Sequence, residues 1–139
     1  MLKLKNISLA FVLGTAAVLA CSSCRERCEA GLGGNVTLVA YAKHHGKPIF
    51  GTEQWPDSAL IKFNASELPG VNASDYDLVV VGKAGDDFVR IEGLKCGNYY
   101  VFMTGFDANF NARVVGGIPV TIAQESGELH LDVPVTEGD

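Results

Sequence analysis

The chain has 139 residues, of which 47% are hydrophobic and 19% are charged, and its formal net charge is −5. This length suits one domain, and the apolar content is sufficient for a packed core, which argues against global disorder. An acidic chain without a cluster of lysines or arginines lacks the positive charge that dominates nucleic-acid binding, so we expect no nucleic-acid partner.

The first twenty residues have the pattern of an export signal. Lys3 and Lys5 form a short basic segment, and residues 7–20 are small, apolar or uncharged and end before Cys21. Such a run is too short for a membrane-spanning helix and is typical of a signal peptide. We therefore predict that residues 1–20 are a signal peptide that is removed from the mature protein.

The residues around the end of this run, Val18-Leu19-Ala20-Cys21, resemble the bacterial lipoprotein box. The resemblance implies that Cys21 is acylated and becomes the first residue of the mature chain, which would lie in the bacterial cell envelope. We expect the outer membrane, on its periplasmic or surface face. Two or three acyl chains anchor a protein stably, because each buried methylene contributes about 0.8 kcal/mol. The alternative is an ordinary secretory signal that is cleaved nearby.

Three further cysteines follow, at Cys24, Cys28 and Cys96. In an oxidising compartment their expected role is a disulfide, which would join Cys28, or alternatively Cys24, to Cys96, or else close a small loop between the first two. A zinc site that combines these cysteines with His44 or His45 is a second possibility, although the spacing lacks paired zinc knuckles.

The mature chain divides into a tether and one folded domain. Residues 21–34 are polar and then glycine-rich, which predicts a flexible lipid-anchored tether. From residue 35 to residue 139 apolar and polar side chains alternate with period two, and turn signals separate the segments. The expected strands cover residues 36–43, 59–64, 76–83, 88–92, 98–106, 117–122 and 129–135. This pattern predicts a single all-β antiparallel sandwich of about seven strands.

A family resemblance lies in residues 88–101, which read Phe-Val-Arg-Ile-Glu-Gly-Leu-Lys-Cys-Gly-Asn-Tyr-Tyr-Val. This stretch resembles the prealbumin-like sandwich domains, also called transthyretin-like, carboxypeptidase regulatory or Cna-B type. Their shared pattern is Gly93-Leu94, then Gly97 and Tyr99 before another strand. The resemblance implies a prealbumin-like fold. Cys96 stands where these domains usually have proline, which supports a bonding role for this cysteine.

Longer segments, such as YAKHHGKPI and SALIKFNASELPG, resemble small uncharacterised lipoproteins of the Bacteroidota type. This likeness implies a fold and a compartment, but no activity and no functional residue.

Four features are candidate sites. His44 and His45 would hold one metal ion only if the chain turns at residues 46–48, because neighbouring strand residues point to opposite faces. The alternative is a polar strand end. Trp55 lies in a long loop that we expect to form a contact surface, and Ser58 follows an aspartate in a short O-glycosylation pattern. The remaining candidate is a calcium site formed by Asp75, Asp77, Asp86 and Asp87, whose spacing matches no EF-hand loop.

The sequence contains no recognisable catalytic motif, such as Gly-x-Ser-x-Gly or His-Glu-x-x-His. Within the related folds, 5-hydroxyisourate hydrolases end in Tyr-Arg-Gly-Ser, and this chain does not. We therefore expect no catalytic residue, no enzyme activity and no cofactor. The predicted function is a non-catalytic envelope lipoprotein that acts as a binding or structural module, with an envelope protein or a glycan as partner. The alternatives are a metal or small-ligand carrier that uses His44 and His45, and a cryptic hydrolase.

Overall fold

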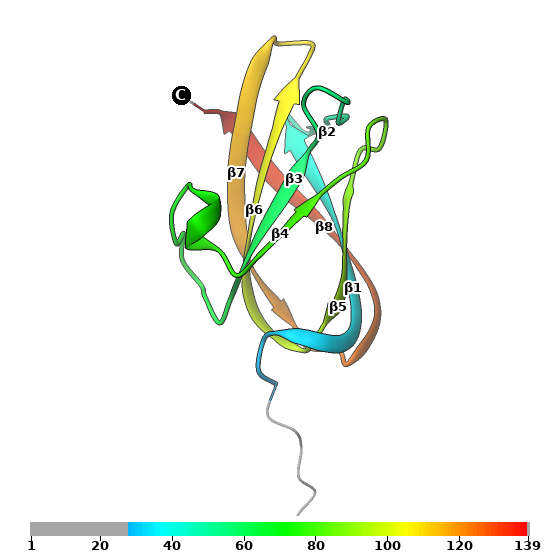
Figure 1. Cartoon of the computed structure of the whole chain (residues 1–139), viewed down its shortest axis with the longest axis vertical. Helices are drawn as coiled ribbons and strands as arrows, with labels where there is room; N and C mark the ends of the chain where they lie inside the picture. The colour runs from blue at the N-terminus through cyan, green and yellow to red at the C-terminus, as the bar shows by residue number, and fades with distance from the viewer. Residues whose placement is uncertain (1–27, 139) are drawn as a thin grey trace, which may run out of the picture.

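The computed structural model describes residues 28–138, and its regular elements are strands apart from one short 3-10 turn, Ala73–Asp75 (Figure 1). The strands are β1 (Leu32–His44), β2 (Lys47–Pro48), β3 (Ser58–Phe63), β4 (Leu78–Val81), β5 (Val89–Leu94), β6 (Gly97–Asp107), β7 (Ala112–Ile122) and β8 (Ser126–Glu137). The predicted all-β class is therefore confirmed. The predicted signal peptide, Cys21 and Cys24 lie outside the described residues. Within residues 28–138 no helix is long and apolar enough to span a membrane.

The strands form one curled, mixed sheet. Their order is β2-β1-β8-β7-β6-β3-β4, and β5 pairs with β1. Strands β7 and β8 share only two residue pairs, Val114 with Glu137 and Val115 with Thr136, so the sheet turns there and its two parts face each other as a half-barrel (Figure 1).

The prediction of a purely antiparallel arrangement is wrong. Strand β8 runs parallel to β1 from the Asn35–Ser126 pair to the His44–Val135 pair. Alternating side chains show that a segment is a half-buried strand, but they do not show which strand lies beside it or in which direction. The structure has eight strands where about seven were predicted, and the additional one is the short β2 at residues 47–48.

The core lies between the two facing parts of the sheet. In β1 the side chains of Val36, Leu38, Ala40 and Ala42 are all at most 1% exposed, as the period-two pattern predicts. They join one apolar cluster with residues of the other strands, among them Ile61, Ile91, Val101, Met103 and Val133. Burial of these side chains from water supplies the main driving force for folding.

The folded domain begins earlier than the predicted boundary at residue 35. Cys28 forms a disulfide with Cys96, with 5.0 Å between the Cα atoms. Gly34 packs directly on the next strand, because an added Cβ would overlap the carbonyl oxygen of Leu94. Gly34, one of the glycines that indicate a flexible tether in the sequence, is therefore a close-packing glycine in the fold. Residues 28–34 belong to the domain, and only residues 21–27 remain as the predicted tether.

The tyrosine of the prealbumin-like pattern, Tyr99, ties this first segment to the sheet. Its side chain is fully buried, and its hydroxyl accepts a hydrogen bond from the Gly31 N–H (3.0 Å) and donates one to the Lys95 carbonyl (2.7 Å). The structure therefore gives this tyrosine a polar role in addition to the packing role that the sequence predicts.

We expect the Tyr99→Phe variant to lose about 1–3 kcal/mol of unfolding free energy, because buried partners are left without a hydrogen bond. Urea denaturation measures the change. Tyr100→Phe is the matched control, since Tyr100 is also buried (8% exposed) and its hydroxyl makes no hydrogen bond within residues 28–138. Equal losses in the two variants would contradict the role of the Tyr99 hydroxyl.

Candidate metal centre

The candidate site lies at the end of the molecule opposite the start of the described chain (Figure 1). Strand β1 runs from the disulfide end to this end, and its 13 residues span roughly 40 Å at the usual rise per residue. A pocket of about 530 Å³ opens here. Its walls are His44, His45, Lys47, Pro48, Ile49, Phe50, Phe106, Asp107, Ala108, Asn109 and Phe110.

The central contact of the site joins His44, the last residue of β1, to Asp107, the last residue of β6. The Nδ1 atom of His44 lies 2.8 Å from Oδ2 of Asp107, and both side chains are buried. Burial raises the pKa of Asp107, but hydrogen bonds from His44 and from the Asn109 N–H outweigh it, so the pKa lies below its usual value. An ionised Asp107 accepts a hydrogen bond from the Nδ1–H of His44, and in this tautomer the lone pair of the ring lies on Nε2.

The Nε2 atom of His44 is buried and has no hydrogen-bond partner within the described part of the chain. Oε1 of Glu137, from the end of β8, lies 3.4 Å away but without the alignment of a hydrogen bond. An unpaired buried polar atom is costly, by about 1–3 kcal/mol. His44 therefore offers a buried nitrogen atom whose lone pair is free to bind a metal ion at this end of the molecule.

His45 completes the group because the chain turns immediately after β1. Its φ is +49° and that of Gly46 is +77°, and the turn places the rings of His44 and His45 4.2 Å apart between centroids. The chain thus turns directly after β1, as a shared metal ion requires, but the turn is formed by His45 and Gly46 and not by the predicted residues 46–48, of which 47–48 form β2. His45 Nε2 lies 3.9 Å from Oε1 of Glu137.

Three possible ligand atoms thus come together, one each from His44, His45 and Glu137, all within 4.8 Å of one another. The pKa of Glu137 lies below its usual value, first because its own backbone N–H donates a hydrogen bond to the carboxylate. Phe110 packs on both imidazole rings, with centroid distances of 5.0 Å to His44 and 4.9 Å to His45. Two imidazoles and a carboxylate form a ligand set typical of zinc.

Sequence reasoning identified the two histidines but missed Asp107 and Glu137. Both carboxylates stand at strand ends far from the histidines in the sequence, and no local motif marks them. Only the pairing of β8 with β1 and the position of β6 bring them to this end.

The other residues that the sequence suggested as sites do not join this group of metal ligands. Trp55 is 50% exposed and stacks on Phe106 beside the pocket, with 5.7 Å between ring centroids. Ser58 is the half-buried first residue of β3, and the aspartate before it, Asp57, is buried. Cys28 and Cys96 are joined to each other, so the zinc site that combined cysteines with histidines is wrong.

The four aspartates proposed for calcium do not converge. Asp77 instead accepts hydrogen bonds from Lys62 and from the Phe63 N–H, and Asp75 accepts one from the Asn72 N–H. Within residues 28–138 no three of these aspartates form a group that could hold an ion.

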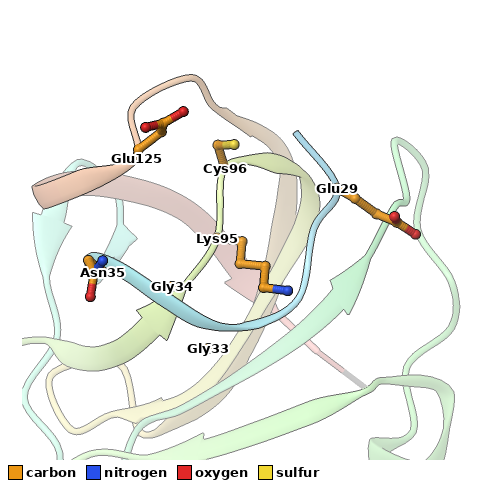
Figure 2. A pocket seen from close by; sticks show the side chains of 7 residues that line it. All are labelled: Glu29, Gly33, Gly34, Asn35, Lys95, Cys96 and Glu125. Carbon is orange, nitrogen blue, oxygen red and sulfur yellow. The ribbon is translucent and has the colours of Figure 1, made fainter. Parts of the chain in front are cut away.

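A second hollow, of about 430 Å³, lies at the disulfide end. Figure 2 shows Glu29, Lys95, Cys96 and Glu125 around the first segment of the chain, with side chains that point in different directions. None of its lining residues belongs to the group of possible metal ligands. We therefore assign the candidate site to the histidine end.

Comparisons with known proteins leave the family open. No family model and no curated protein matches the chain. Among solved structures, the crystal structure of a DUF4876 family protein from Bacteroides thetaiotaomicron is 19% identical, with a TM-score of 0.40, and the match covers 73% of this chain and 24% of that chain. The chain thus spans about a quarter of that protein.

Proposed function

We propose that this protein is a non-catalytic binding module of the bacterial cell envelope, anchored by lipid on Cys21, and that it binds a divalent transition metal ion, zinc in the first place. The ligands would be His44, His45 and Glu137. The observation that carries this proposal is the buried Nε2 of His44, which has no hydrogen-bond partner among residues 28–138 and is held toward the other two ligands by Asp107.

A metal ion explains this arrangement better than a polar strand end does. Metal-bound histidines usually donate their second ring N–H to a carboxylate, as His44 does to Asp107. Binding of a cation at Nε2 would also remove the cost of an unpaired buried nitrogen. Calcium and magnesium prefer oxygen ligands, so the two imidazoles favour zinc or a similar transition metal.

We also propose that the domain is a prealbumin-like sandwich and that it has a defined orientation relative to the membrane. The prealbumin-like sandwich is supported by Gly93 and Gly97, whose φ angles of +76° and +148° suit the connection of that pattern, and by the buried Tyr99. An anchor on Cys21 would join the domain at the disulfide end. The histidine pocket would then face away from the membrane (Figure 1), where an envelope ligand or partner has access to it.

Zinc titration by calorimetry, on mature protein that has been stripped of metal, tests the proposal. We expect binding of about one ion per chain. Removing a ligand with His45→Ala or Glu137→Gln should weaken binding by at least about tenfold, and Asp107→Asn by roughly 10–100-fold, because Asp107 orients His44. The two ligand variants change exposed side chains, so we expect both to fold.

His130→Ala is the matched control. His130 is the other histidine of the described chain, lies on β8 as Glu137 does, and is paired with Glu128 and Tyr41 away from the site. We expect its zinc affinity to equal that of the wild type. Absence of zinc and copper binding in the wild type, or an equal loss in the control, would contradict the metal site.

A further inference from the structure

We propose that the bound metal keeps one coordination position open toward the pocket, and that this position takes a small carboxylate ligand whose apolar part lies against Phe50, Phe106 and Phe110. This inference rests on the proposed function, because it requires the metal ion. It extends that function from binding of an ion to recognition of an organic anion.

The first step concerns the number of protein ligands. Within residues 28–138 the group offers three ligand atoms, and Asp107 does not add a fourth, because its oxygens accept hydrogen bonds from His44 and from the Asn109 N–H. Zinc sites are usually tetrahedral, and sites with three protein ligands hold water or an exogenous ligand in the fourth position. Since His44 and His45 are part of the pocket wall, that position would be reached from the pocket.

The second step concerns charge. A divalent metal ion with the carboxylates of Asp107 and Glu137 has no net charge, and Lys47 on the pocket wall adds one positive charge. The occupied site would therefore favour a ligand with one negative charge. A carboxylate meets this condition and also coordinates zinc through oxygen.

The third step concerns the shape and surface of the pocket. Phe50 and Phe110 are 59% and 55% exposed although both are large and apolar, and the ring of Phe106 stacks with that of Trp55. A pocket of about 530 Å³ with mostly apolar walls and a few convergent polar groups has the character of a small-molecule site. Because Phe110 packs on both histidine rings, a ligand on the metal would touch this side chain.

Benzoate is a suitable probe, with benzyl alcohol as its uncharged analogue and acetate as the carboxylate without a ring. The single tryptophan of the chain, Trp55, stacks beside the pocket and provides a fluorescence signal, which calorimetry would complement. We expect benzoate to bind the zinc-loaded protein about tenfold more tightly than either analogue and about tenfold more tightly than it binds the metal-free protein. Zinc occupancy of each sample is measured first, so failure of the metal site is distinguished from failure of the carboxylate site.

Two variants separate the contributions of the pocket. Phe110→Ala removes the aromatic wall and Lys47→Gln removes the positive charge, while the three metal ligands remain. We expect each to weaken benzoate binding severalfold in zinc-loaded protein, whereas Leu68→Ala, which changes an exposed apolar residue outside the pocket, has no effect. The proposal is overturned if zinc-loaded protein does not bind benzoate, if binding is equal without zinc, or if neither pocket variant changes it.

Discussion

Replacing Cys28 and Cys96 together by serine is expected to lower the free energy of unfolding by about 4 kcal/mol, because the disulfide closes a loop of 68 residues in sequence separation. The disulfide lowers the conformational entropy of the unfolded chain. The resulting stabilisation of the folded state grows with the logarithm of the loop length. In the folded state it also holds the first segment where Ala30 packs on Gly97, whose added Cβ would overlap the Ala30 backbone. A loss of this size is a large part of the stability of a small domain.

Urea denaturation of the double variant and of the wild type measures this effect. Treatment of the wild type with a reducing agent should reproduce the loss, and the double variant should not respond to the reducing agent. Cys24→Ser is the control, because Cys24 is the alternative partner that the sequence leaves open. A loss of stability in Cys24→Ser as large as that in the double variant would contradict the pairing of Cys28 with Cys96.

The strands could be predicted from the sequence because burial leaves a local pattern. Each half-buried strand places alternate side chains in the core, as β1 does with Val36, Leu38 and Ala40, and this period is visible without any knowledge of the neighbours. The parallel pairing of β1 with β8 left no such pattern, because the side-chain alternation is the same for both directions.

The start of the domain shows a different limit of sequence reasoning. Glycine is suited both to flexible linkers and to positions where two backbones approach closely, and composition does not distinguish these two uses. Gly34 belongs to the second kind because it lies against Leu94, and this contact is formed only in the folded chain.

The candidate metal centre was half predictable for a related reason. His44 and His45 are adjacent in the sequence and are followed by a turn signal, so local features indicated them. Asp107 and Glu137 come from the ends of β6 and β8, and only the tertiary structure brings them to the histidines. The sequence could therefore suggest possible ligands but not the carboxylate that orients His44, which provides the stronger argument for a metal site.

Asp57 is the second residue for which a large effect is expected. Its side chain is 2% exposed and precedes β3, and its Oδ1 has no hydrogen-bond partner among residues 28–138. Gly105 makes room for it, because a Cβ at that position would overlap Oδ1 of Asp57 and Cδ1 of Ile49. Burial raises the pKa of Asp57 from 3.8 to about 6. The carboxylate is therefore less stable in the folded protein than in the unfolded chain.

The expected dependence on pH follows from this shift. Below pH 3.8 the side chain is protonated in both states, and Asp57 does not penalise folding. Between pH 3.8 and about 6 the folded state retains the proton more strongly, so the stability contributed by the protonated group falls as the pH rises. Above about pH 6 the loss is complete and amounts to roughly 3 kcal/mol, at 1.36 kcal/mol per pKa unit.

We therefore expect Asp57→Asn, which keeps the shape of the side chain and removes its charge, to be more stable relative to wild type at pH 7 than at pH 4, by roughly 2.4 kcal/mol. The measurement is the difference between the two urea unfolding free energies at each pH, because other carboxylates contribute equally to both proteins. Asp132→Asn, at a side chain that is 69% exposed, should show a difference that hardly changes with pH. A constant difference for Asp57→Asn as well would show that the buried carboxyl does not titrate as this structure requires.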